Sequence, residues 1–182
     1  ISRLNRYIQS KNINECPISK VYLRSKKEKH VINTENVIGI IPGKSDTSII
    51  ISAHYDHLEK KGNIMFPGAD DNASGVASML EIAEKLASRK DSLDYNYLFM
   101  AFGAEEMGLI GSKYFVNNMS FPDSLIKDMI NIDMVGRMKT DRSLQISGVG
   151  TSLEGESILN ELNKKYNFKL DYSYKGYETS NN

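Results

Sequence analysis

Apolar runs that end in histidine or carboxylate residues constrain the fold of this chain more than any other feature. Each run is rich in β-branched and aromatic residues, a pattern typical of a strand buried in a sheet. The run at 47–53 is followed by His54, and the run at 95–103 is followed by Glu105 and Glu106. The run at 129–135 contains Asp133. Because ligands bind beyond the carboxyl ends of strands in open α/β sheets, these side chains are expected to meet at one edge.

Helical patterns separate the predicted strands. Residues 109–118 and 152–166 repeat apolar side chains at helical spacing. A further β-branched run at 36–43 ends in a Pro-Gly turn and predicts a strand buried on at least one face, and 144–147 and 168–174 are also expected to be strands. The most regular pattern predicts a helix over about 74–88, with the apolar positions Val76, Met79, Leu80, Ala83, Leu86 and Ala87. Strands alternating with helices predict an α/β fold: a mixed, largely parallel central sheet with helices on both faces.

One domain accounts for all 182 residues, since neither a linker nor a repeat is present. Residues 1–35 are expected to form an N-terminal extension with edge strands, at 21–23 and 31–32. Lysine plus arginine and aspartate plus glutamate number 23 each, so the net charge predicts no nucleic-acid partner. No apolar run approaches the roughly 20 residues of a membrane span.

The polar residues at the strand ends are those of metal-dependent hydrolysis. At an extended strand end, His54 and Asp56 project to the same side, and the aspartate can fix the tautomer of a metal-binding histidine. Of the adjacent pair Glu105 and Glu106, one can bind a metal while the other accepts a proton from the attacking water. One histidine with three or four carboxylates suits zinc.

Each motif also has a plainer interpretation. Asp70 and Asp71 would be stabilised at the start of any helix by the unpaired N–H groups there. Asp133 could equally cap a helix or form a salt bridge. His57 is expected in a loop, facing solvent or substrate rather than binding a metal. The zinc motif HExxH, a phosphate-binding glycine loop and a nucleophile elbow are all absent.

Four segments together resemble one family. They are residues 52–57 (SAHYDH), 67–75 (PGADDNASG), 101–112 (AFGAEEMGLIGS) and 131–136 (NIDMVG), in the same order and spacing as in the M28 zinc aminopeptidases. The resemblance implies a zinc-exopeptidase-like α/β/α sandwich. It also implies a peptide substrate, export from the cell, whether periplasmic, secreted or surface-anchored, and a cis peptide bond between Asp71 and Asn72.

The resemblance further implies a site for two zinc ions. Asp71, in the Asp-x-x-Ser-Gly register, would bridge the ions, while His54 and Asp133 complete one metal position and Glu106 binds the other. Glu105 would be the general base, and Asp56 would orient His54. Water activated in this way would hydrolyse amino-terminal residues from peptides.

The sequence departs from the family in one respect. The family supplies a late histidine to the metal position of Glu106, and no histidine follows His57 here. We therefore expect a chain truncated at its C-terminus, with an incomplete second metal position and with self-association or swapping through an open sheet edge. A carboxypeptidase, a glutaminyl cyclase and a non-catalytic binding module on the same fold stay open as alternatives.

Overall fold

The computed structural model describes residues 24–26 and 31–174. By its contacts the chain divides into two units, Ile1–Asn33 and Thr34–Asn182. Val31 and Ile32 of the first unit are exposed and belong to no strand, so the prediction of a strand there was wrong. Two apolar residues are too short a run to fix a strand without a paired partner. The predicted strand at 21–23 lies outside the described residues.

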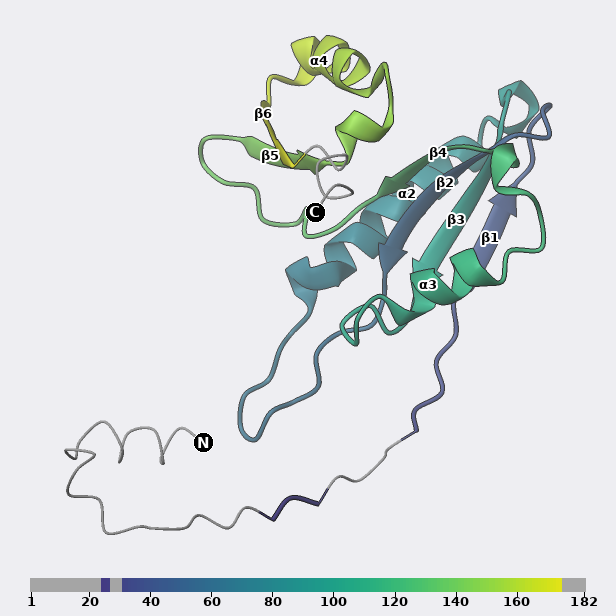
Figure 1. Ribbon diagram of the computed structural model, residues 1–182. Helices are drawn as coiled ribbons and strands as arrows, with labels where there is room; N and C mark the ends of the chain where they lie inside the picture. The colour runs from purple at the N-terminus through teal and green to yellow at the C-terminus, as the bar shows by residue number, and fades with distance from the viewer. Residues whose placement is uncertain (1–23, 27–30, 175–182) are drawn as a thin grey trace, which may run out of the picture. The chain divides into compact units, whose positions relative to one another are not determined.

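A mixed sheet of four strands forms the centre of the second unit, in the order β1-β3-β2-β4 (Figure 1). Its strands are β1 (Val37–Ile41), β2 (Ser48–His54), β3 (Asn96–Phe102) and β4 (Ile126–Asn131). β2 pairs in parallel with both β3 and β4, and only β1 runs antiparallel. The predicted mixed, largely parallel sheet is therefore confirmed.

Helices cover both faces of this sheet. On one face, α2 (Gly75–Ala87) packs Val76, Ile82 and Leu86 against a core that includes Ile51 of β2 and Phe99 of β3. On the other face, Phe115 of α3 (Ile110–Asn117) packs against a core of Ile50, Leu98, Met100 and Phe102. Neighbouring residues of a strand point to opposite faces, so β2 and β3 contribute to both cores.

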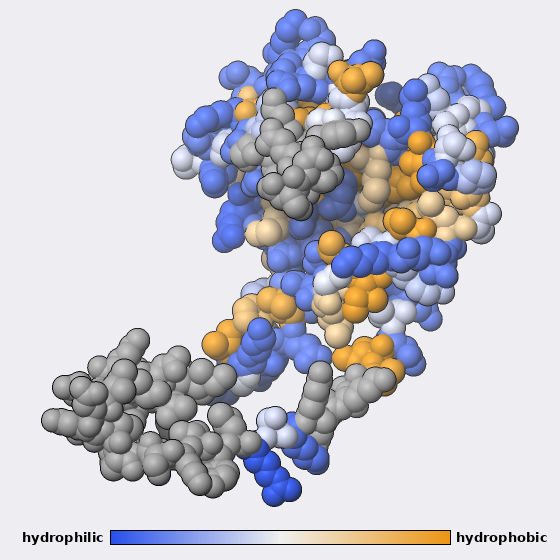
Figure 2. Space-filling model, in the orientation of Figure 1, coloured by the Kyte–Doolittle hydropathy of each residue, from blue (hydrophilic) through white to orange (hydrophobic). Residues whose placement is uncertain are grey.

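The two edge strands differ from expectation, since both were predicted to be buried. In β1 only Ile41 is partly buried, and in β4 Met129 and Ile130 are about half exposed. The helices lie over the central strands, so among the described residues little covers the edges. Figure 2 shows apolar side chains exposed between hydrophilic ones on one face of the molecule. Leu80, predicted to lie on the apolar stripe of α2, is 60% exposed.

A second, smaller sheet follows along the chain. It pairs β5 (Ser143–Ser147) in parallel with β6 (Lys169–Tyr174), and α4 (Gly155–Tyr166) connects these strands. All three elements were predicted from the sequence. Within the part of the chain that the structure describes, no helix is both long enough and apolar enough to cross a membrane.

Candidate metal centre

The candidate site lies at the carboxyl ends of three neighbouring strands. β2 ends at His54, β3 ends three residues before Glu105, and β4 ends two residues before Asp133. β2 lies between β3 and β4 and runs parallel to both, so their ends reach the same edge. The sheet therefore brings together residues that are far apart in sequence, as predicted.

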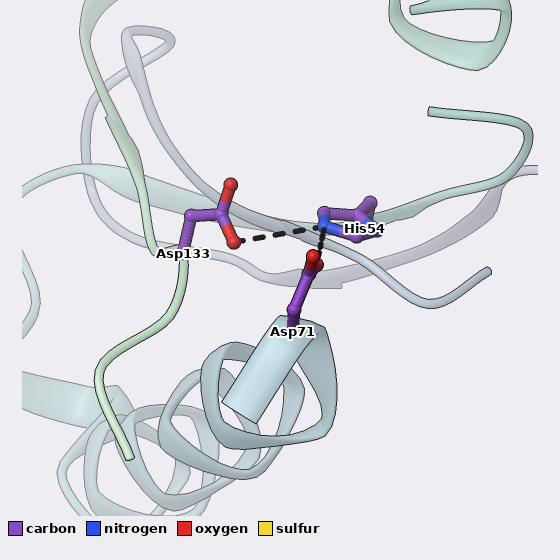
Figure 3. Close-up of side chains that lie close together, drawn as sticks. All are labelled: His54, Asp71 and Asp133. Atoms are coloured by element: carbon purple, nitrogen blue, oxygen red, sulfur yellow. Dashed lines mark ion pairs between the residues drawn. The ribbon is translucent and has the colours of Figure 1, made fainter. Parts of the chain in front are cut away.

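Three side chains converge on a single point at this edge (Figure 3). The Nε2 atom of His54 lies 3.1 Å from Oδ1 of Asp71 and 3.6 Å from Oδ1 of Asp133, and both carboxylates point toward the ring. Oε2 of Glu105 lies 4.0 Å from the same nitrogen. One imidazole nitrogen surrounded by carboxylate oxygens is an arrangement that can hold a divalent cation.

The backbone of Asp56 fixes the ring of His54. The Nδ1 atom of His54 lies 3.1 Å from the carbonyl oxygen of Asp56, and 3.7 Å from its carboxylate. A proton on Nδ1 donated to this carbonyl leaves the Nε2 lone pair facing the carboxylates. The orienting contact is thus made by the main chain of Asp56 rather than by the carboxylate that the sequence suggested.

The carboxylate of Asp56 instead holds the loop that carries both glutamates. It accepts hydrogen bonds from the backbone N–H of Glu105 at 2.9 Å and of Glu106 at 3.2 Å. The end of β2 and the end of β3 are thereby joined through one side chain. Asp56 positions the two glutamates, and this role had no signal in the sequence.

Asp71 lies in a turn, Ala69–Ser74, directly before α2. The Asp71–Asn72 peptide bond is cis, as the resemblance implied. A Cβ at Gly75 would collide with the Asn72 side chain and the carbonyl of Ile132, which explains glycine at this position. Asp71 also belongs to a second group of ligand-type side chains, with His57 and Glu106.

Asn72 ties this turn to the segment that carries Asp133. Its buried side chain donates to the carbonyl of Ile132 at 3.0 Å and accepts from the N–H of Gly75 at 3.0 Å and of Met134 at 3.2 Å. The backbone on both sides of Asp133 is therefore held by the residue next to Asp71. Asp70 adds a further tie, since its carboxylate accepts from the N–H of Gly136.

Replacing Asn72 by alanine is expected to destabilise the fold by about 2–3 kcal/mol, because buried partners lose their hydrogen bonds. The freed Asp133 segment should also weaken metal binding by about 10–100-fold, as loss of a supporting contact typically does. Thermal unfolding and metal titration measure the two effects. Asn118→Ala, at an exposed asparagine whose side chain bonds only the carbonyl of Tyr114 in the described residues, is the matched control. Unchanged metal affinity in Asn72→Ala would contradict this positioning role.

His57 was expected to face solvent or substrate, and the structure places it against Glu106. Its Nδ1 atom lies 3.2 Å from Oε1 of Glu106, and the side chain is 22% exposed. That Glu106 and Asp71 share a metal position stays a prediction, and the two residues belong to one ligand group. No pattern in the sequence indicates that His57 belongs to this group as well.

The electrostatics of the site shift two pKa values upward. Burial lowers the pKa of His54, but the carboxylates of Asp133, Glu105 and Asp71 and the carbonyl of Asp56 outweigh it, so the net shift is upward. Burial raises the pKa of Glu105, and the neighbouring carboxylates of Glu106, Asp133 and Asp56 raise it further, against the lowering effect of His54. A carboxylate with a raised pKa is a better proton acceptor, which suits a general base.

Comparison with known proteins assigns this arrangement to a family. The sequence model of Peptidase family M28 matches residues 36–181. The chain belongs to peptidase family M28. This M28 chain is 38% identical over 107 residues to aminopeptidase YwaD of Bacillus subtilis (strain 168), which covers 57% of this chain and 22% of that relative. It is 26% identical over 147 residues to leucine aminopeptidase 1 of Trichophyton equinum, covering 74% of this chain and 38% of the relative.

Solved structures agree with the M28 assignment. LapB from Legionella pneumophila superposes with a TM-score of 0.61 at 29% identity, over 78% of this chain and 39% of that one. A glutaminyl cyclase from an Acidobacteriales bacterium has a TM-score of 0.61 at 20% identity, over 76% and 50%, and shows the fold alone. The M28 chain therefore spans less than half the length of the curated relatives named above, at 22% and 38%.

Proposed function

We propose that this M28 chain is the metal-binding part of a zinc-dependent aminopeptidase, which hydrolyses the amino-terminal residue from peptides. The observation that carries the proposal is that Asp71 belongs to two groups of ligand-type side chains, with Glu105 beside one of them. A carboxylate shared by two metal positions is the arrangement of two-metal aminopeptidases. Two curated relatives are named aminopeptidases, which supports the same activity.

The residues present fit zinc. Each group offers one imidazole nitrogen and carboxylate oxygens that lie within 4.8 Å of one another. Two atoms of the second group, Nδ1 of His57 and Oε1 of Glu106, are buried without a hydrogen-bond partner among the described residues. An ion bound between them would satisfy both atoms. His54, Asp71 and Asp133 would hold one zinc, and Asp71 and Glu106 would contribute to the other.

Zinc at these positions supplies a site for the free α-amine and Lewis acidity for the scissile carbonyl and the attacking water. Glu105 is the general base in this proposal. Its carboxylate accepts a proton from the water as the oxygen attacks the carbonyl carbon, and delivers that proton to the nitrogen of the leaving amine. The peptide C–N bond then breaks, which gives a free amino acid and a shortened peptide. Asp56 holds the backbone of Glu105 in place throughout.

Release of leucine from a leucyl p-nitroanilide by zinc-loaded protein tests the proposal. Turnover that is lost with a chelator, restored by zinc and absent with an N-acetylated substrate is expected. Conversion of an N-terminal glutamine peptide to its cyclic product would instead favour the glutaminyl cyclase alternative. Binding of the peptide without turnover would favour a non-catalytic module. Self-association or swapping through an open sheet edge and export from the cell stay predictions, for sedimentation and cell fractionation to check.

Zinc affinity is expected to fall as the pH is lowered through the pKa of His54, which lies above its usual value of 6.5. A doubly protonated imidazolium cannot bind zinc, so the proton on Nε2 of His54 must leave first. In metal-free protein the sign is opposite: the contribution of His54 to stability is present below 6.5 and is lost as the pH rises through the raised pKa. Competition with a chelator between about pH 6 and pH 8 measures the first effect. An affinity independent of pH over this range would contradict the assignment of His54 as a ligand.

A further inference from the structure

The contact between His57 and Glu106 identifies a ligand that the family pattern does not supply. We propose that His57 is the imidazole ligand of the second metal position in this chain, together with Glu106 and the shared carboxylate of Asp71. The inference rests on the proposed function, because it concerns the second of its two ions. It also differs from the expectation, drawn from the sequence, that this position is incomplete.

The first observation is a pair of buried atoms without partners. Nδ1 of His57 and Oε1 of Glu106 are inaccessible to solvent, and neither makes a hydrogen bond within the described residues. The two atoms nevertheless lie 3.2 Å apart, so they face each other without the geometry of a hydrogen bond. Such an arrangement costs folding free energy unless something else satisfies both atoms. A cation bound by both atoms satisfies them.

The spacing of the atoms suits zinc. Ligand nitrogen and oxygen atoms lie about 2.0–2.2 Å from a zinc ion, so two of them in tetrahedral geometry are about 3.4 Å apart. The 3.2 Å between His57 and Glu106 is close to this value, as is the 3.1 Å between His54 and Asp71 in the other group. The ligand atoms of His57, Asp71 and Glu106 all lie within 4.8 Å of one another.

The chain around His57 holds its ring in this position. The ring packs edge-on against Phe66, with centroids 6.4 Å apart and planes at 76°. On another side it lies against Gly68, which has a φ of 70° and precedes the turn that carries Asp71. A Cβ at Gly68 would come within 3.0 Å of the imidazole Cδ2. The glycine therefore gives the ring room beside the shared carboxylate.

Part of the His57 side chain reaches the surface, although its Nδ1 atom is buried. His57 lines an open depression of about 410 Å³, together with Tyr55, Pro67 and residues from the first turns of α2. A second imidazole three residues after His54 thus serves a second ion from the same strand end. The sequence contains three histidines in all, and only His30 remains besides these two.

Zinc stoichiometry after equilibrium dialysis against chelator-buffered zinc tests the proposal without reference to activity. Unmodified protein is expected to hold two ions per chain. His57→Ala should hold one, with the affinity for the second ion at least about 100-fold weaker, because removal of a ligand exceeds the 10–100-fold effect of losing a supporting residue. His30→Ala is the matched control and should hold two. One ion in the unmodified protein, or two in His57→Ala at unchanged affinity, would overturn the proposal and leave a simple ion pair between His57 and Glu106.

A spectroscopic measurement on the unmodified protein covers the case in which His57→Ala fails to fold. In ¹⁵N-histidine NMR, Nδ1 of His57 is expected to shift on addition of zinc, whereas coordination of His54 moves Nε2. A resonance of Nδ1 of His57 that does not change up to two equivalents of zinc overturns the assignment. Two bound ions and a shifted His57 in protein that hydrolyses no peptide would support this inference while refuting the aminopeptidase activity, so the two failures are distinguishable.

Discussion

Glu105→Gln is expected to lower kcat by about 10²- to 10⁴-fold while zinc stays bound, because the amide cannot accept the proton of the attacking water. The two side chains have nearly the same shape, so the loop should keep its conformation. The backbone N–H of residue 105 still donates to Asp56 in the variant, since only the side chain changes. Steady-state kinetics and zinc analysis on the same preparation measure the two properties.

The neighbouring glutamate provides a sharp comparison. Glu106→Gln changes a side chain that lies 3.2 Å from His57, in the second ligand group, so it should weaken binding of one zinc ion. Glu59→Gln, at an exposed glutamate two residues after His57, should change neither property. Turnover of Glu105→Gln within about tenfold of the unmodified protein would refute the role of Glu105 as general base.

Asp71→Ala is expected to remove both zinc ions, because Asp71 is the residue common to the two ligand groups. The side chain is 36% exposed, so its truncation leaves no buried cavity that would unfold the domain. Zinc in hundredfold excess over its Kd stabilises a protein by about 2.7 kcal/mol for each site. The unmodified protein should gain stability on this scale when zinc is added, and Asp71→Ala should gain none.

Thermal unfolding with and without zinc measures this difference. Asp91→Ala, at an exposed aspartate in the connection after α2, is the matched control and should respond to zinc as the unmodified protein does. Asp133→Ala should weaken zinc binding only at the metal position that includes His54. Retention of two tightly bound ions by Asp71→Ala would show that Asp71 does not bridge them.

Local sequence patterns were sufficient for the elements of the fold. The helical spacing of Val76, Met79 and Leu86 predicts α2, and the β-branched run at 47–53 predicts β2, because both patterns reflect the side on which a residue meets the core. The patterns did not predict the exposure of the two strands at the edges of the sheet. Apolar residues in β1 and β4 were predicted to be buried, but the position of a strand at an edge depends on which strands pair, and periodicity does not encode pairing.

For the candidate site, too, local sequence patterns predict some features, and others depend on tertiary packing. The sequence alone was enough to predict which ligand-type side chains lie at the edge of the sheet, since His54, Asp71, Glu105, Glu106 and Asp133 all follow or adjoin apolar runs whose ends meet in a parallel sheet. Only the tertiary structure decided how they are held. The contact of His57 with Glu106, the hydrogen bonds from residues 105 and 106 to Asp56, and the tie through Asn72 each join segments that are 49 to 62 residues apart. Contacts at such separations arise from the packing of whole elements, and no local pattern predicts them.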